Sequence, residues 1–226
     1  MKYLIICSIL TFSINAFIFQ STQAQKITEP PWTTTQEIKR LHKKLGLQKY
    51  LKFHIFQKAV YGQRHLYFRN KKILSIVDFT KPAYQKRLFV IDLAKKKVLY
   101  RTYVAHGLNS GNYSYATKFS NQNGSKMSSL GFYKTSETYK GKHGFSLKLD
   151  GLEWGINHKA RQRYIVMHGA KYVSAKSVGR SWGCPAIPLH LTHPIIHLIK
   201  GGSCLFIYAN DRRYLDKSKY MFRNAF

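Results

Sequence analysis

Cys184 combines a nucleophilic side chain with neighbours that can make it reactive. A cysteine attacks as its thiolate, and an unperturbed thiol is mostly protonated at neutral pH, so it needs a base or a positive neighbour. His168 is predicted to be the base, and Arg180 is predicted to be the positive neighbour. A thiol and an imidazole at one site are suited to nucleophilic attack on a carbonyl carbon through a covalent thioester.

Gly183 leaves the position next to the sulfur without a side chain, so a carbonyl substrate can approach closely. The backbone N–H groups of Trp182, Gly183 and Cys184 are predicted to converge on the oxyanion that forms during attack. The alternative is that Cys184 is a small buried core thiol, the usual place of a free cysteine. Pro185 and Pro188 favour the nucleophile, because a buried strand or helix rarely tolerates so much glycine and proline.

Short β-type runs are the elements that must position these residues. The apolar run Ile165 to Met167 leads into His168 and Gly169 and predicts that a strand presents the histidine. One late helix is predicted from Thr192 to Lys200, with Pro194 in its first turn. The predicted strands are Ile73 to Phe79, Arg87 to Leu93, Val98 to Ala105, Gly131 to Thr135, Phe145 to Leu149, Tyr164 to His168 and Ser203 to Ala209. This pattern predicts a mainly β domain of sandwich or barrel type.

Two helices are predicted before the first strand. The threonines at 33–35 followed by Glu37 predict a helix start, and Gly46 ends a short basic helix after Leu45. A second helix is predicted from Lys49 to about His65, where apolar residues recur at helical spacing. We expect the pair to form a cap that packs on the β domain; binding of a partner is the alternative.

The N-terminus has the composition of an export signal. Lys2 precedes an apolar run from Tyr3 to Phe19, and the small residues before Gln25 suggest a cleavage site. The run is short and interrupted by polar residues for a membrane span, although an uncleaved anchor is the alternative. The predicted layout is a signal peptide over 1–24, a helical segment over 25–70 and a catalytic domain over 71–226. An exported protein would work in the periplasm or cell envelope.

The net charge is +29, from 38 Lys and Arg against nine Asp and Glu. Such a charge attracts anionic polymers, and nucleic acid is the first that such a basic composition suggests. The export signal argues against nucleic acid and favours anionic polymers of the envelope; a merely solvated cationic surface is the alternative. Glycosidases need two positioned acids, and Asp78, Asp92, Glu137, Asp150 and Glu153 show no obvious pairing in the sequence.

Three cysteines are present. Cys7 lies inside the apolar N-terminal run and receives no role. Cys204 lies in a run that predicts a buried strand, so we expect a core thiol rather than a disulfide, which would also remove the nucleophile.

The residues around His168 and Cys184 resemble a known family. Met167-His168-Gly169 and the segment 181–184, SWGC, are similar to the signature of the YkuD-type L,D-transpeptidase catalytic domain, which remodels bacterial peptidoglycan. The similarity is greatest to a murein L,D-transpeptidase branch and covers about 74–208. Its motifs read here VAHGLNSG at 104–111, FSN at 119–121, SSLGFY at 128–133, GKHG at 141–144 and GRSWGCPA at 179–186.

The resemblance implies a β-sandwich or barrel-like catalytic domain and a specific reaction. Cys184 would attack the carbonyl at the L-centre of a stem peptide and release D-alanine, and Ser181 could help to orient the site. The acyl group would then pass to an amine of another stem, or to water in an L,D-carboxypeptidase. No metal or organic cofactor is required. An inactive cationic wall-binding protein is a further alternative. Papain-like enzymes place the catalytic cysteine before the histidine in the chain. Here His168 precedes Cys184, which argues against that class.

One departure concerns substrate binding. Most of the wider family carries an arginine two residues after the cysteine, where this chain has Ala186. Arg180 is the predicted replacement. The resemblance also makes the glycine-rich loop after the predicted strand 98–105 a wall of the substrate groove, with further polar residues beyond it. The predicted contacts are His106, which is also the rival base, Ser110, Asn121 and Ser129.

His193 and His197 have the i, i+4 spacing of zinc ligands on a helix, with His190 nearby. No acidic residue lies between them and no third ligand is evident, so we expect ordinary histidines of a half-buried helix and no metal.

Overall fold

The computed structural model describes residues 34–221, which lie in one compact unit. The predicted export signal and its cleavage site lie outside the described residues. None of the helices between residues 34 and 221 is long and apolar enough to cross a membrane.

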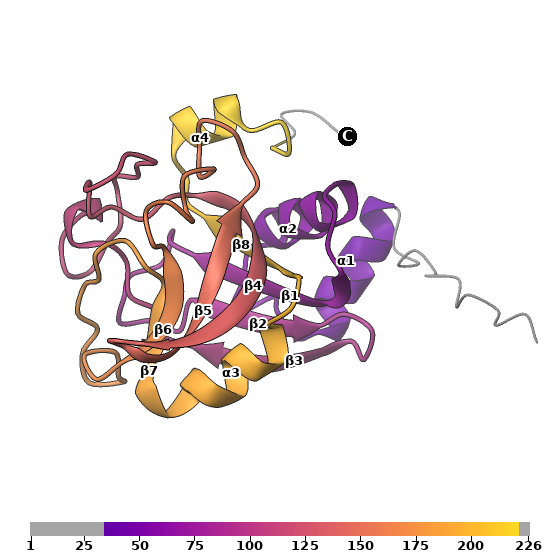
Figure 1. The fold of residues 1–226 in the computed structure, drawn as a ribbon. Coiled ribbons are helices and arrows are strands. Elements are labelled where there is room, and N and C mark those ends of the chain that lie inside the picture. The colour runs from indigo at the N-terminus through magenta and orange to yellow at the C-terminus, as the bar shows by residue number, and fades with distance from the viewer. Residues whose placement is uncertain (1–33, 222–226) are drawn as a thin grey trace, which may run out of the picture. The chain divides into compact units, whose positions relative to one another are not determined.

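One eight-stranded sheet forms the centre of the fold (Figure 1). The strands are β1 (Asn70–Asp78), β2 (Leu88–Asp92), β3 (Lys97–Thr102), β4 (Gly131–Gly141), β5 (Gly144–Gly151), β6 (Val166–Ala170), β7 (Ala186–Pro188) and β8 (Ser203–Tyr208). Their order in the sheet is β3-β2-β1-β8-β4-β5-β6-β7. The β1–β8 and β6–β7 pairs are parallel, and the other neighbours are antiparallel.

The two edges of the sheet approach each other and nearly close it. Ala105, three residues after the edge strand β3, forms an antiparallel bridge with Ala186 in the other edge strand, β7. Strands β2 and β8 are buried along their whole length, so both of their faces are covered. The prediction of a mainly β domain is therefore confirmed, and the near closure protects strand edges that would otherwise remain exposed.

Within residues 34–221, four α-helices surround the sheet. They are α1 (Thr35–Lys44), α2 (Phe53–His65), α3 (Thr192–Ile199) and α4 (Arg212–Lys217), with short 3-10 turns at Leu108–Ser110 and Leu189–Leu191. Helix α1 begins at a capping box, in which the Thr34 side chain accepts from Glu37 N–H and the Glu37 carboxylate accepts from Thr34 N–H. The predicted N-terminal pair and late helix are therefore present. Helix α4, capped by Asp211, is an element that the sequence analysis did not predict.

Strand β4 is longer than predicted and brings a tip of the sheet to His168. It continues to Gly141, and β5 returns from Gly144, whose φ of 73° suits a glycine at a tight turn. Lys142 and His143 therefore form the tip of a hairpin. The motif GKHG at 141–144 is thus this hairpin tip, a role that the linear sequence did not reveal.

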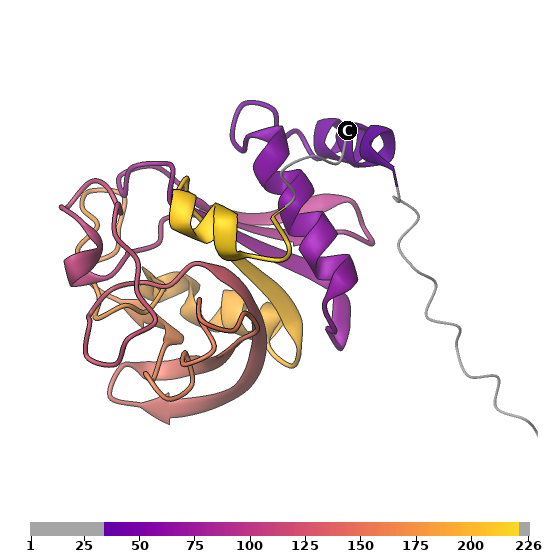
Figure 2. The same cartoon turned by 90° about the horizontal axis from the view of Figure 1, so that it is seen from above.

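Helix α2 packs on β1 and β8, and Figure 2 shows it lying along this part of the sheet. Gly62 permits the contact, because a Cβ there would lie 2.0 Å from the Phe132 ring of β4. Gly62→Ala is expected to lower the free energy of unfolding by about 1 kcal/mol net. Overpacking costs roughly 1–3 kcal/mol, which outweighs the roughly 1 kcal/mol that alanine gains over glycine in a helix.

Chemical denaturation of the purified protein measures this effect. His65→Ala, at the exposed end of the same helix, is the control and is expected to change stability by less than about 0.5 kcal/mol. A Gly62→Ala protein as stable as the parent would contradict the packing of α2 on the sheet.

Candidate active site

The parallel pair β6–β7 brings Cys184 to His168. His168 is paired with Ala186 in this register, so Cys184 lies just before the strand that runs alongside the histidine. The Cys184 thiol donates to the Tyr164 carbonyl, with Sγ 3.6 Å from the oxygen, and it is also hydrogen-bonded to the backbone of Val166. Val166 and His168 are two residues apart on β6, so the backbone that contacts the thiol belongs to the strand that carries the imidazole. The thiol and the imidazole are thereby held at one end of the same strand pair.

Tyr164 adopts an unusual backbone conformation at this point. Its φ of 55° lies in the left-handed region that residues other than glycine rarely adopt. The surrounding structure holds this conformation, which turns the Tyr164 carbonyl toward the Cys184 thiol.

Burial raises the pKa of the Cys184 thiol, while the Val166 backbone and the charges of Arg163 and Lys142 lower it. The residue is half-buried. Burial is the largest of these influences, so the resting side chain is a thiol at neutral pH. The thiolate must then be formed by a base when substrate is present.

His168 has the protonation state that such a base needs. Its Nδ1 lies 3.0 Å from the Gly169 carbonyl oxygen, which can only accept, so Nδ1 carries the proton and Nε2 has a free lone pair. Burial lowers the pKa of His168, as do the charges of His143 and Lys142, so the ring is neutral near pH 7. The His143 ring stacks on it, with centroids 4.2 Å apart.

Ser181 shapes the turn that carries the nucleophile. Its hydroxyl donates to the Cys184 carbonyl at 2.6 Å and accepts from the Gly183 N–H at 3.1 Å. This corrects the prediction that the Gly183 N–H would face an oxyanion, because that group already has an acceptor. Among the hydrogen bonds formed within residues 34–221, none uses the N–H groups of Trp182 or Cys184. Those two groups are the remaining candidates for an oxyanion hole.

Gly183 is required at this turn for two reasons. Its φ of 119° disfavours any side chain, and a Cβ would lie 2.7 Å from the Met127 carbonyl oxygen. The Ser128 hydroxyl, in turn, donates to the Gly183 carbonyl. The segment 125–129 therefore packs directly against the nucleophile turn.

The structure contradicts the predicted substrate contacts of His106 and Ser110, which are both fully buried. His106 Nδ1 accepts from Arg87 and its Nε2 donates to the Asn112 carbonyl. Burial and the nearby charge of Arg87 lower the pKa of His106 to about 4. The Ser110 hydroxyl accepts from the Ser128 N–H. His106 is therefore a neutral framework residue and not a rival base.

Ser129 and Asn121 are also committed to contacts within the protein. Ser129 is buried and its hydroxyl accepts from Arg163, while the Asn121 side chain contacts His158 Nδ1 and accepts from the Lys159 N–H. Both line a cavity of about 180 Å³ together with Tyr214 and other residues of the α4 region. Their polar groups therefore already have partners within the protein, and their role as groove contacts stays a prediction.

Arg180 does not act as the predicted positive neighbour. Its Nη1 donates to the carbonyls of Leu108 and Gly111, both at 3.1 Å, and its guanidinium covers the Tyr113 ring at 4.2 Å. Arg180 thus secures the 108–111 loop, and Arg163 and Lys142 are the positive charges that lower the pKa of Cys184.

Arg163 is a site residue that the sequence analysis missed. Its guanidinium donates to four oxygens of one loop. These are Ser120 O, Ser129 Oγ, Ser125 Oγ and Met127 O. Arg163 therefore fixes the loop that packs on Gly183 while its charge stabilises the thiolate of Cys184. Nothing in the linear sequence distinguishes it from the other basic residues.

Cys184 is expected to react slowly with iodoacetamide at neutral pH. The rate of alkylation should rise only above the pH at which an ordinary thiol ionises. The reason is the raised pKa of the half-buried Cys184 thiol. Lys142→Met should shift the midpoint of this rate-against-pH curve to still higher pH, because the positive charge of Lys142 lowers the pKa of Cys184. Alkylation rates between pH 6 and 11 test both statements. Cys204 is fully buried and should add no signal. A midpoint below that of a free thiol would contradict the account.

His193 and His197 stack on Phe145, with ring centroids 4.6 and 5.0 Å from its own. Within the described range 34–221, no group of three or more His, Cys, Asp or Glu side chains is arranged to hold a metal ion.

Comparison with known proteins identifies a family. The family model of the L,D-transpeptidase catalytic domain matches residues 47–208. No curated protein matches this chain.

Solved structures with similarity to this chain include three bacterial proteins. An L,D-transpeptidase from Mycobacterium smegmatis is 11% identical, with 61% of this chain and 59% of that chain covered and a TM-score of 0.40. One from Stackebrandtia nassauensis is 14% identical, with 78% of each chain covered and a TM-score of 0.38. The helical cell shape determining protein of Campylobacter jejuni is 14% identical, with 70% of this chain and 56% of that chain covered and a TM-score of 0.43. This chain thus spans less than two thirds of the first and third structures.

Proposed function

Because this chain belongs to the L,D-transpeptidase catalytic domain family, a family of peptidoglycan-modifying enzymes, we propose that it is a cysteine acyltransferase acting on peptidoglycan stem peptides. Cys184 takes the acyl group of one stem, releases D-alanine and transfers the acyl group to an amine of another stem. The observation that carries this proposal is the neutral His168, whose Nε2 lone pair is free on the strand next to the Cys184 thiol.

In the first half-reaction, His168 Nε2 takes the proton from the Cys184 thiol as the sulfur attacks the carbonyl carbon at the L-centre of the donor stem. The carbonyl oxygen becomes an oxyanion, which the free N–H groups of Trp182 and Cys184 are suited to stabilise. The C–N bond then breaks, and His168 gives its proton to the departing amine of D-alanine. A thioester on Cys184 remains.

In the second half-reaction, an amine of a neighbouring stem attacks the thioester and His168 takes the proton that the amine loses. The C–S bond breaks, and the sulfur recovers a proton from His168. Since His168 is both acid and base, a ring that is neutral at rest serves both half-reactions. The hydrogen bond to the Gly169 carbonyl keeps the proton on Nδ1 and so leaves the Nε2 lone pair available for both steps.

The proposal places the protein outside the cytoplasm, in the periplasm or cell envelope, where its substrate lies. The export signal predicted over 1–24 supports this location. The net charge of +29 further supports contact with the anionic polymers of the envelope.

Incubation with purified muropeptides tests the function. With tetrapeptide muropeptides, mass spectrometry is expected to detect crosslinked dimers and one free D-alanine for each crosslink. Tripeptide muropeptides, which lack the leaving residue, are the matched control and should give no product. Tripeptides without dimers would assign the protein as a carboxypeptidase, with water as acceptor. Unchanged tetrapeptides from a folded protein would contradict the acyltransferase.

A further inference from the structure

Trp182 exposes an aromatic surface immediately beside the nucleophile. Its side chain is 67% exposed, and two ammonium groups lie over its ring. Lys126 Nζ is 4.8 Å from the ring centroid and Lys142 Nζ is 5.5 Å from it. The two lysines come from distant segments, so their meeting on one indole is a product of the fold. Two positive charges are thereby held at Trp182, which lies two residues before Cys184 in the chain.

Lys126 is held in this place by its backbone. Its φ of 54° is again the left-handed conformation that residues other than glycine rarely adopt. The Lys126 carbonyl accepts from the Asn109 N–H, and a Cβ on Gly107 would lie 2.5 Å from the same oxygen. Close packing from two sides therefore maintains a conformation that the residue alone would avoid.

Lys142 is held by the hairpin tip between β4 and β5. Its neighbour His143 stacks on His168, which attaches the tip to the catalytic base. The charge of Lys142 lowers the pKa of both Cys184 and His168, so the ammonium lies near both reacting groups.

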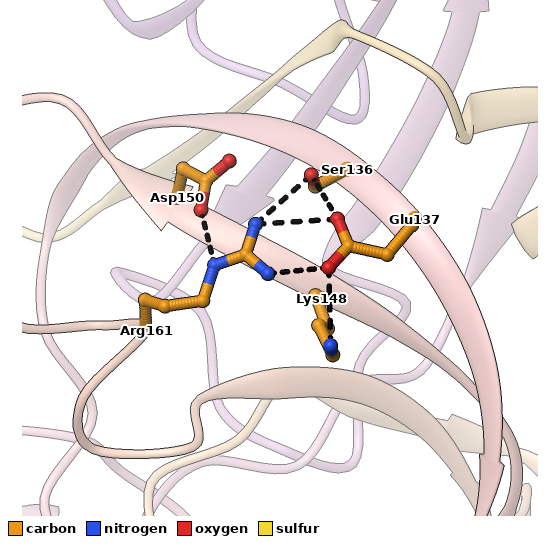
Figure 3. Close-up of polar contacts among 5 residues, drawn as sticks. All are labelled: Ser136, Glu137, Lys148, Asp150 and Arg161. Atoms are coloured by element: carbon orange, nitrogen blue, oxygen red, sulfur yellow. Dashed lines mark hydrogen bonds and ion pairs between the residues drawn. The ribbon is translucent and has the colours of Figure 1, made fainter.

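Neither lysine has an acidic partner among residues 34–221. The acids that the structure describes are engaged elsewhere. Glu137 and Asp150, for example, meet at Arg161, and Lys148 also binds Glu137 (Figure 3). The sequence did not predict that Glu137 and Asp150 lie close together. Because the Arg161 guanidinium lies between their carboxylates, the two acids do not form a glycosidase pair. The ammonium groups of Lys126 and Lys142 are therefore available to an anion that the substrate brings.

We propose that Lys126 and Lys142, held over Trp182, bind a carboxylate of the donor stem next to the scissile bond and select donors that carry it. This inference rests on the proposed function, because the stem supplies the anion. An ammonium that rests on an aromatic face keeps N–H groups for a carboxylate. The two ammonium groups thus supply positive charge beside Cys184, where Ala186, two residues after the cysteine, supplies none.

Two carboxylates of a stem have the right chemistry. One is the terminus of the D-alanine that leaves, and the other is on the D-centre of diaminopimelate. Three synthetic tetrapeptides separate them: the native acid, the peptide with a C-terminal amide, and the peptide with the diaminopimelate carboxylate amidated. The first-turnover rate of Cys184 acylation by each peptide is measured for the parent, Lys126→Met, Lys142→Met and the double variant.

The parent is expected to prefer the native acid to one of the two amides by roughly tenfold or more, which is the effect of losing one charged hydrogen bond. That preference should fall in each single variant and vanish in the double variant, with the loss appearing in the peptide concentration that gives half the maximal first-turnover rate. Lys140→Met is the control: Lys140 is exposed in the same hairpin, two residues from Lys142, and no contact brings it to Trp182. It should leave the preference unchanged.

A preference that survives in the double variant, or no preference in the parent, would overturn this inference while acylation itself upholds the proposed function. If no peptide acylates a folded protein whose Cys184 still reacts with iodoacetamide, the proposed function fails, and the carboxylate site fails with it.

Discussion

Cys184→Ala should abolish D-alanine release from tetrapeptide donors, with a fall in kcat of at least about 10⁴-fold. The sulfur is the proposed nucleophile, and Cys184 lies just before β7, the strand that pairs with β6 at His168. The substitution should leave the fold intact, because Cys184 is half-buried and the Ser181 contacts of the turn involve only backbone groups of residues 183 and 184. The rate of D-alanine release measures the effect.

Cys204→Ala is the matched control for this experiment. Cys204 is fully buried in β8, so its loss should reduce stability by creating a small cavity and should retain turnover. Substantial D-alanine release by Cys184→Ala would show that another group attacks the substrate. Loss of activity in both variants together with a loss of folded protein would locate the effect in stability.

His168→Gln should lower kcat by roughly 10²–10⁴-fold, the usual contribution of a positioned general base. Glutamine can still donate a hydrogen bond, but it cannot take a proton from Cys184. The pH profile gives a second readout. The pKa of His168 is lowered by burial, so the activity of the parent should fall only when the pH drops below the range of an ordinary histidine. That acidic limb should disappear in His168→Gln.

His190→Gln is the control for this variant, because His190 is exposed in the 3-10 turn after β7 and has no part in the site. Its activity and pH profile should match those of the parent. A His168→Gln enzyme that keeps full activity and the acidic limb would assign the base to another group.

The turn that carries Cys184 was predictable from the sequence because the residues that form it are local. Gly183, Cys184 and the prolines after them leave few other structures open, and the strand before His168 is a simple apolar run. The hydrogen-bond partner of each backbone N–H group in this turn could not be predicted from the sequence. Whether Gly183 N–H faces a substrate or Ser181 Oγ depends on the dihedral angles of the turn, and only the folded structure sets those.

The predicted substrate contacts of His106 and Ser110 failed for a different reason. His106 stands in a polar, glycine-rich loop, which normally lies at the surface. Arg87, buried in the core, donates to His106 and to the Val104 carbonyl and so holds the beginning of this loop inside the protein. A buried arginine such as Arg87, whose pKa burial lowers to about 9, is rare, and no local sequence pattern predicts it.

The missed elements share a dependence on distant partners. Strand β7 has three residues and contains Pro188, so it has no periodicity of its own and exists only because β6 pairs with it. Similarly, Lys142 and His143 look like a solvated turn until the length of β4 and β5 is known. That length brings the tip of the hairpin to His168 and Trp182.

The covalent intermediate gives the most direct test of the central claim that Cys184 carries the acyl group. The parent protein is mixed with a tetrapeptide donor, quenched with acid within the first turnover and weighed intact. We predict an added mass equal to the tripeptide less one water, and digestion should locate it on the fragment that contains Cys184. An adduct on any other residue, or D-alanine released with no adduct on Cys184 at any time in the first turnover, would contradict the account.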